Sequence, residues 1–212
     1  MRRSPSWRDA ELIVVDLETT GLDAGSDEIV SFGAVPVIGG RLAAAGAVYG
    51  LVRPERELPR ESIEIHGIRP QDLAGAASAP DALLPLAEAI GERQVVAHAA
   101  WVERTFLQRP LRQLGRRPPR TLIDTAMLWR LLCIDRGRPD PGYTHLGTLA
   151  AELGLPAHRA HHALGDALTA AQVFLALATH LETFGRRTVR ALAHADRPVE
   201  QHTVLHGRAN RT

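Results

Sequence analysis

Asp16 and Glu18 are the residues whose types and spacing point most directly to chemistry. They follow a short β-branched apolar run at 12–15, which predicts a buried strand. Residues two apart on a strand share a face, so both carboxylates are expected on one side of the strand's end. Such a pair repels itself and loses hydration, so it needs a cation or a proton. Oxygen ligands suit Mg²⁺ or Mn²⁺, and metal–carboxylate sites at strand ends are typical of phosphate-ester chemistry.

Two acidic residues far along the chain are candidates to complete this site. Glu103 falls early in a helix expected at 101–108, directly after a short apolar strand at 94–97. Asp166 lies at the start of a long helix expected at 163–181, where the helix N-terminus favours an anion. Four carboxylates can hold two divalent ions about 4 Å apart for phosphoryl transfer, while a nearby histidine accepts a proton from water.

The composition favours one soluble domain and excludes several classes of protein. A chain of 212 residues that is 45% hydrophobic can bury one sizeable core, and a net charge of +1 excludes a strongly basic nucleic-acid coat. The single Cys133 excludes an internal disulfide and a cysteine-based zinc site. No uninterrupted apolar run reaches the ~20 residues needed to span a bilayer, and the first ten residues lack a signal-peptide core. We therefore expect a cytoplasmic protein without a membrane partner.

The order of the expected elements predicts an α/β fold. Strands at 12–16, 28–38 and 44–52 come first, followed by a loop region at 54–70. The remaining elements are a helix at 80–90, a strand at 94–97, a helix at 101–108 stopped by Pro110, a strand end at 122–124, and helices at 126–132, 146–153 and 163–181. This order indicates a mixed sheet. We expect a polar, disordered leader at 1–10, the folded domain at 11–184 and a basic tail of uncertain order at 185–212.

Several segments together resemble one enzyme family. The sequence VDLETTGL at 15–22 resembles the first motif of the DEDDh 3′→5′ exonucleases, a family that includes the proofreading epsilon subunit of bacterial DNA polymerase III. His161 and Asp166 match the third motif, a histidine five residues before an aspartate. The segments at 59–68 and 122–125 also look like family sequence in the expected order. The resemblance covers about 11–181 and implies a ribonuclease-H-like, mainly five-stranded mixed sheet flanked by helices, with 11–184 as the exonuclease domain.

The resemblance also implies a site. Asp16, Glu18 and Asp166 would bind two Mg²⁺ or Mn²⁺ ions, with Glu103 as the fourth ligand and His161 as the general base. The residues expected to approach or contact the terminal nucleotide are Thr19, Thr20, Gly21, Leu22, Glu61 and His66. Gly21 would permit close approach because it lacks a Cβ.

The second motif departs from the family pattern. The family shows His-Asn-Ala, one residue, then Phe-Asp, whereas this chain shows HAAWVE at 98–103. Glu103 is one methylene longer than aspartate, so it would reach a metal through a different rotamer or a bridging water. This difference supports an alternative, a nucleic-acid-binding or scaffold module with a weakened site.

Five further residues near these motifs each allow two interpretations. Helical spacing favours His162 as the partner of Asp166, whereas family spacing favours His161, which we prefer as the base. We expect His98 to buttress a strand end, Asp124 to make structural hydrogen bonds, and Trp101 to pack rather than border the site.

The expected function is metal-dependent 3′→5′ exonucleolysis that releases nucleoside monophosphates. Single-stranded 3′ ends would be the substrate, with DNA favoured over the alternative of RNA trimming, which depends on 2′-OH contacts. A polymerase subunit or a second copy of the chain would be the protein partner.

Overall fold

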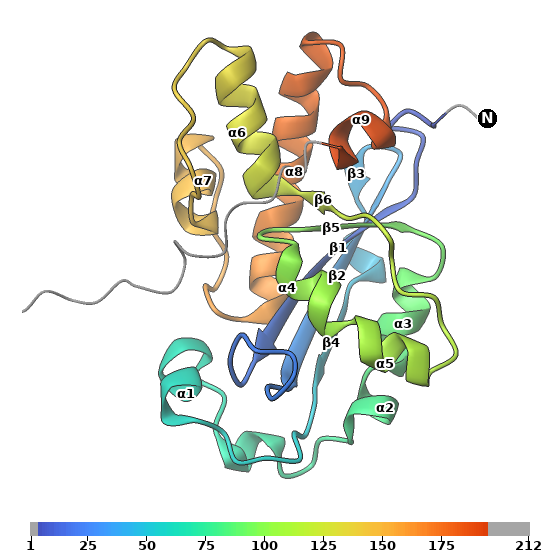
Figure 1. The fold of residues 1–212 in the computed structure, drawn as a ribbon, viewed down its shortest axis with the longest axis vertical. Coiled ribbons are helices and arrows are strands. Elements are labelled where there is room, and N and C mark those ends of the chain that lie inside the picture. Colours follow the sequence, from blue (N-terminus) through green and yellow to red (C-terminus); the bar gives the residue numbers. More distant parts are fainter. Residues whose placement is uncertain (1–3, 195–212) are drawn as a thin grey trace, which may run out of the picture.

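A mixed β-sheet forms the centre of the molecule (Figure 1). The structure is a computed structural model that describes residues 4–194. Strand β1 (Leu12–Thr19) pairs antiparallel with β2 (Ile29–Ile38) and parallel with β5 (Gln94–Ala97), which in turn pairs parallel with β6 (Ile123–Asp124). The expected α/β class and mixed sheet are therefore confirmed.

Two short strands share the outer edge of β2. They are β3 (Arg41–Leu42) and β4 (Val48–Leu51), so six strands make a sheet five strands wide. The strand expected at 44–52 is shorter than predicted because a 3-10 turn at Ala44–Gly46 occupies its first part.

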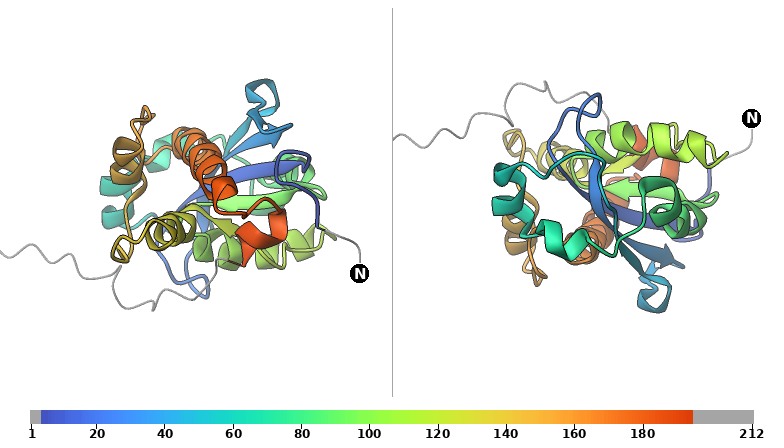
Figure 2. Two further views of the ribbon diagram at one scale, coloured as in Figure 1. Left: turned by 90° about the horizontal axis from the view of Figure 1, so that it is seen from above. Right: turned by 90° about the horizontal axis from the view of Figure 1, so that it is seen from below.

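Helices cover both faces of the sheet (Figure 2). On one face lie α6 (Thr125–Asp135), α7 (Leu146–Glu152) and α8 (Ala163–Thr183). The other face is covered by α3 (Leu84–Ile90), α4 (Trp101–Phe106) and α5 (Gln108–Gln113). The two layers enclose two hydrophobic clusters, one on each side of the sheet.

The alternation along β1 decides where the acidic pair points. Leu12 and Val14 belong to the cluster under α8, whereas Ile13 and Val15 belong to the cluster on the opposite face. Asp16 and Glu18 continue the first series, so both carboxylates lie on the α8 face. The expectation that they share one side of the strand is consistent with this pattern.

Gly33 lets the beginning of α8 lie directly against the sheet. It pairs with Asp16 across β1 and β2, and a Cβ atom there would lie 2.3 Å from the Leu164 backbone nitrogen. Any side chain at this position would therefore push α8 outward. Because Gly33 has no side chain, the first turn of α8, which carries Asp166, lies beside Asp16 and Glu18.

Three sequence expectations about helices are wrong. The loop region expected at 54–70 contains α1 (Arg60–His66), a helix too short to show a clear apolar period, and a 3-10 turn at Pro70–Leu73. The helix expected at 80–90 is divided into α2 (Ala79–Ala82) and α3. Pro110 does not stop the chain's helical course, because it lies in the first turn of α5, where its missing N–H costs no helical hydrogen bond.

Both ends of the described chain are ordered, contrary to the expected disordered leader. Trp7 is 1% exposed and packs edge-on against Phe174, while Ser6 forms a β-bridge to Thr188. The short helix α9 (Val189–Ala193) closes the same end. One anchoring tryptophan leaves no periodic signal, which is why the sequence did not reveal this contact. Residues 1–3 and 195–212 of the expected leader and tail lie outside the described residues, and the domain boundaries stay a prediction.

Within the described residues, α8 alone has the length and apolar composition needed to cross a membrane. More than half of its most apolar stretch is buried inside the molecule, as in the core helix of a globular domain. This property is therefore weak support for a membrane span.

Candidate active site

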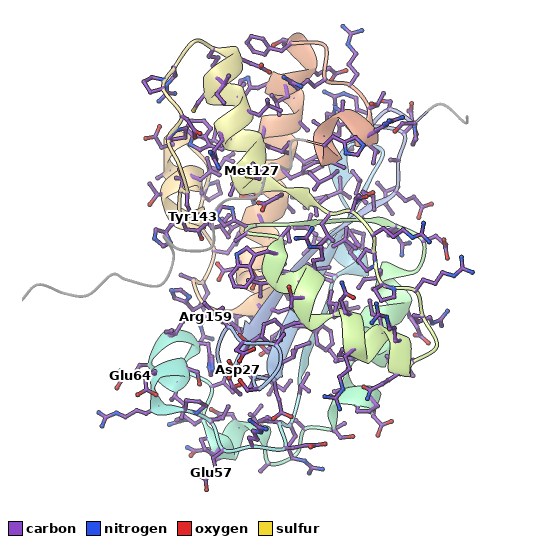
Figure 3. All side chains as sticks on the ribbon, viewed as in Figure 1. Asp27, Glu57, Glu64, Met127, Tyr143 and Arg159 are labelled. Carbon is purple, nitrogen blue, oxygen red and sulfur yellow. The ribbon has the colours of Figure 1, made fainter. Side chains whose placement is uncertain are left out.

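A cleft of about 770 Å³ opens at the carboxyl end of β1. All of the residues predicted from the sequence line it, namely Asp16, Glu18, Thr19, Thr20, Gly21, Leu22, Glu61, His66, Glu103, His161 and Asp166. Helix α1 borders the cleft, as do the segment around Tyr143 and the start of α8. Figure 3 shows Tyr143 and Arg159 on the same side of the molecule as Glu64 of α1.

Three side chains come closest together. Glu18, His161 and Asp166 each offer a ligand atom, and these atoms lie within 4.8 Å of one another. The His161 backbone N–H donates a 2.8 Å hydrogen bond to Asp166 Oδ2, and His161 has a φ of 55°, which is rare for a residue with a side chain. This hydrogen bond helps hold the histidine in its strained conformation beside the carboxylates.

His162 makes different contacts. Its side chain accepts a hydrogen bond from the Gly165 backbone N–H as the N-cap of α8, and its ring stacks on Tyr49. The structure therefore places His161, and not His162, beside Glu18 and Asp166.

The carboxylates of the cleft stabilise protons in the absence of a cation. Burial raises the pKa of Glu18 to about 7, and the charge of Asp166 adds to the effect. Burial also raises the pKa of Asp16, with further contributions from Glu103, Glu18 and Asp166. The same cause raises the pKa of Glu103 and of Asp166. Buried acids that raise one another's pKa form a site with a high affinity for positive charge.

Glu103 reaches the cleft despite its extra methylene. It is 2% exposed, and its Oε2 atom has no hydrogen-bond partner among the described residues. A buried carboxylate oxygen without a partner is costly, and a divalent ion would satisfy it. The donor set, carboxylate oxygens with one histidine nitrogen nearby, fits Mg²⁺ or Mn²⁺.

A second polar group fixes the turn that carries Glu103. Asp124 accepts hydrogen bonds from the backbone N–H groups of Ala99, Ala100 and Ala126 at 3.1, 3.0 and 2.9 Å. It thereby caps α6 and holds the start of α4 with one carboxylate. The expectation of a structural role for Asp124 is confirmed.

His98 links the same turn to Thr144, next to the cleft residue Tyr143. Its Nε2 lies 3.0 Å from the Thr144 carbonyl oxygen, to which it can only donate, and its Nδ1 lies 2.9 Å from the Thr125 hydroxyl. Loss of hydration lowers the pKa of His98 to about 4, so the ring is neutral and Nδ1 accepts from Thr125. The expected buttressing role is confirmed.

The segment after β1 is shaped by internal contacts. Pairing between β1 and β2 shifts register between Glu18 and Thr19, as is common next to functional sites. The Thr20 hydroxyl donates to Asp27 Oδ1, and a Cβ on Gly21 would lie 2.4 Å from Asp27 Oδ2. A side chain at position 21 would therefore displace the Asp27 carboxylate, which accepts hydrogen bonds from the Thr20 hydroxyl and the Asp23 N–H.

His66, the last residue of α1, lines the cleft. The residue is 6% exposed, its Nδ1 accepts the Ile68 N–H at 2.9 Å, and its Nε2 has no partner among the described residues. Burial, followed by the nearby His161, lowers its pKa, so the ring is neutral and carries its proton on Nε2. His66 therefore lines the cleft and holds a buried Nε2–H donor without an acceptor among the described residues.

Sequence reasoning missed two aromatic residues and placed a third one wrongly. Tyr143 and His145 line the cleft and their rings meet edge-on at 5.1 Å, but they lie in a polar Pro/Gly-containing segment without a motif. Trp101, expected to pack rather than to border the site, is half-buried and borders the cleft. An isolated aromatic residue between two motifs was the only signal available for Tyr143.

Comparisons with known proteins agree with this geometry. The model of the exonuclease family RNase_T matches residues 13–174. The chain is 35% identical over 181 residues to a PolC-type DNA polymerase III of Thermotoga maritima, covering 85% of this chain and 13% of the relative. It is 32% identical to a DNA polymerase III subunit epsilon-like protein of Rhodobacter capsulatus, covering 85% of this chain and 25% of that protein. The chain thus spans an eighth to a quarter of the length of these relatives.

Solved structures show the same fold. The nuclease domain of 3'hExo, a DEDDh family member solved with rAMP, superposes with a TM-score of 0.66 at 18% identity, covering 85% of this chain and 96% of that one. Exonuclease X, solved with 5′ overhanging duplex DNA, gives a TM-score of 0.61 at 24% identity, covering 87% and 98%. The predicted ribonuclease-H-like architecture is confirmed. Because the family model covers most of its length, the chain belongs to the exonuclease family RNase_T.

Proposed function

We propose that this chain is a metal-dependent 3′→5′ exonuclease that hydrolyses terminal phosphodiesters of DNA and releases nucleoside monophosphates. The observation that carries the proposal is the convergence of Glu18, His161 and Asp166 within 4.8 Å in a cleft also lined by Asp16 and Glu103. Membership of an exonuclease family supports the reaction type.

The four carboxylates would hold two divalent ions, Mg²⁺ or Mn²⁺. When bound, these ions would supply positive charge to the phosphodiester and to the oxygen that leaves it. Asp16 and Glu18 come from β1, while Glu103 and Asp166 come from the first turns of α4 and α8. Three separate elements thus fix the ligands on a rigid frame.

His161 would act as the general base. It accepts a proton from the attacking water, whose oxygen forms the new bond to phosphorus, while the bond to the 3′ oxygen of the preceding nucleotide breaks. The backbone contact to Asp166 orients the histidine for this transfer.

The segment that follows β1, together with α1, would bind the terminal nucleotide. Thr19, Thr20, Gly21 and Leu22 form one side of the cleft, and α1 supplies Glu61 and His66. The Nε2–H of His66 is a donor suited to an oxygen of the terminal sugar. These assignments follow from position in the cleft together with the resemblance to the family.

The relatives support the proposed substrate and partners. The curated relatives include DNA polymerase III proteins, so we infer that the chain acts on single-stranded 3′ ends of DNA in the cytoplasm, together with a polymerase subunit. A homodimer is the alternative assembly.

The deciding experiment is digestion of a 5′-labelled single-stranded DNA in Mg²⁺ and then Mn²⁺. Wild type, Asp16→Ala and a matched exposed variant on α2, Asp81→Ala, are compared. A ladder that shortens from the 3′ end in wild type and Asp81→Ala, but not in Asp16→Ala, is the expected result. Intact DNA in all lanes would contradict the proposal and favour the binding module weakened at Glu103. Preferential digestion of a matched RNA would favour RNA trimming.

A further inference from the structure

An aromatic and cationic surface lies next to the cleft but takes no part in the proposed reaction. The Tyr49 ring stacks on His162 with ring centroids 4.7 Å apart and planes inclined by 15°, and Tyr49 remains 40% exposed at the edge of the sheet. The Arg159 backbone lies against Gly165 in the same first turn of α8 that follows His162. Burial raises the pKa of Tyr49, as does the charge of Glu18, while the positive charge of Arg159 opposes the rise. We call Tyr49, His162 and Arg159 the edge platform.

Strand register places the edge platform close to the metal ligands. Asp16 pairs with Gly33, and Gly33 pairs with Tyr49, so the three residues form one row across β1, β2 and β4. Directly paired residues share a face, and two strand spacings separate Asp16 and Tyr49 by about 10 Å. The first turn of α8 lies over Gly33, between them.

The consecutive residues His161 and His162, just before α8, make contacts on two different sides of the chain. His161 faces Glu18 and Asp166, whereas His162 faces Tyr49. A single-stranded nucleic acid whose terminal phosphodiester lies beside His161 can therefore reach the edge platform with a nucleotide close to its 3′ end.

The chemistry of the edge platform suits a nucleotide. Stacked aromatic rings bind bases without regard to sequence, and a neighbouring arginine binds the phosphate backbone. Arg159 is exposed, and its guanidinium makes no hydrogen bond or ion pair with the residues the structure describes. Its charge is thus available to a phosphate.

We propose that the edge platform binds a nucleotide upstream of the two nucleotides that the scissile bond joins. The base of that nucleotide stacks on Tyr49 and its phosphate contacts Arg159, while the terminal nucleotide occupies the cleft. The inference rests on the proposed function, because it assumes a single strand that enters the cleft by its 3′ end.

The test is the length dependence of binding. Fluorescence anisotropy measures the affinity for 5′-labelled oligodeoxythymidylates of two and eight nucleotides, with Ca²⁺ in place of Mg²⁺. We expect Tyr49→Ala to weaken binding of the longer oligonucleotide about 5- to 100-fold and to leave the dinucleotide unchanged. Tyr49→Phe should retain the affinity. Arg159→Ala should reduce the slope of log affinity against log salt by about 0.7.

Two exposed residues elsewhere serve as matched controls. Phe184, 44% exposed at the far end of α8, is replaced by alanine to compare with Tyr49, and the exposed Arg117 is replaced to compare with Arg159. An equal loss for both oligonucleotides, or no loss for either, would overturn the edge platform while leaving the proposed function intact. Failure of wild type to bind any oligonucleotide would overturn both.

Discussion

Two buried polar groups meet at the same edge of the sheet, and their hydrogen bonding differs sharply. Asp124 and His98 have every polar atom opposite a donor or an acceptor. The cleft carboxylates raise one another's pKa, and Glu103 Oε2 has no partner within the described part of the chain. The protein itself supplies all the hydrogen-bond partners of Asp124 and His98. The cleft carboxylates obtain a full set of partners only when a cation or a proton binds.

This difference separates positioning from chemistry. Asp124 holds the turn that leads into α4, the helix that carries Glu103, and His98 links that turn to Thr144 beside Tyr143. Asp124 and His98, which we call the bracket, thus form a rigid and fully hydrogen-bonded support. The cleft carboxylates that this support positions are in an unfavourable environment without a cation. The comparison predicts that substitutions in the two groups change stability in opposite directions.

The largest expected effect comes from Asp124→Ala. Removing the carboxylate leaves backbone N–H groups of Ala99, Ala100 and Ala126 without an acceptor, which should lower the free energy of unfolding by about 3 to 5 kcal/mol. Urea unfolding measures the change. Asp140→Ala, which removes an exposed carboxylate paired with Arg130, is the control and should cost about 1 kcal/mol or less. Equal costs for the two variants would contradict the bracket.

The two groups should also respond to pH with opposite signs. Glu18 has a folded pKa of about 7 against an ordinary 4.5, so its contribution lowers stability as pH rises from 4.5 to 7. His98 has a folded pKa of about 4 against an ordinary 6.5, so its contribution raises stability as pH rises from 4 to 6.5. Each amounts to at most about 3 kcal/mol, and the two partly cancel in wild type.

Variants separate the two contributions. Urea unfolding across this pH range in EDTA should show stability rising more steeply with pH in Glu18→Gln than in wild type, because the Glu18 contribution that opposes the rise is removed. His98→Asn should show the opposite trend. Identical pH profiles for wild type and Glu18→Gln would argue against a raised pKa at Glu18.

A smaller effect is expected from charge removal at Glu103. Glu103→Gln relieves repulsion and should stabilise the metal-free protein by about 1 to 2 kcal/mol at pH 8. Mn²⁺ at 100 times its dissociation constant should stabilise wild type by about 2.7 kcal/mol, and less of this gain should remain in the variant. Thermal unfolding with and without Mn²⁺ measures both, with the exposed Glu88→Gln as control. A full Mn²⁺ response in Glu103→Gln would remove Glu103 from the set of metal ligands.

The smallest expected effect concerns the backbone of the bracket. Ala99 has a φ of 56°, a left-handed conformation that disfavours a Cβ, so Ala99→Gly should stabilise the protein by about 1 kcal/mol. Ala100 has a φ of −55°, so Ala100→Gly should destabilise by about 1 kcal/mol. Chemical denaturation of both variants provides the comparison. Destabilisation by both would mean that strain at Ala99 is not relieved by glycine.

Much of the fold and the site was predictable because it depends on local patterns. The β-branched run before Asp16 marks β1, alternation on that strand puts Asp16 and Glu18 on one face, and the apolar segment after Asp166 marks α8. Motif spacing then identified the side chains that line the cleft. These features require only a few neighbouring residues or an ordered set of motifs.

Other features depended on contacts between distant segments. Trp7 is buried by Phe174, and α1 is too short for its period to stand out. The choice between His161 and His162 was open locally, because it depends on how the chain enters α8. The close approach of α8 to Gly33 and the strained φ of His161 turn one ring toward the carboxylates and leave its neighbour stacked on Tyr49. The sequence alone thus determined which residues could carry the chemistry, whereas tertiary packing decided which way they face, because a side chain's direction depends on the surfaces that pack against its backbone.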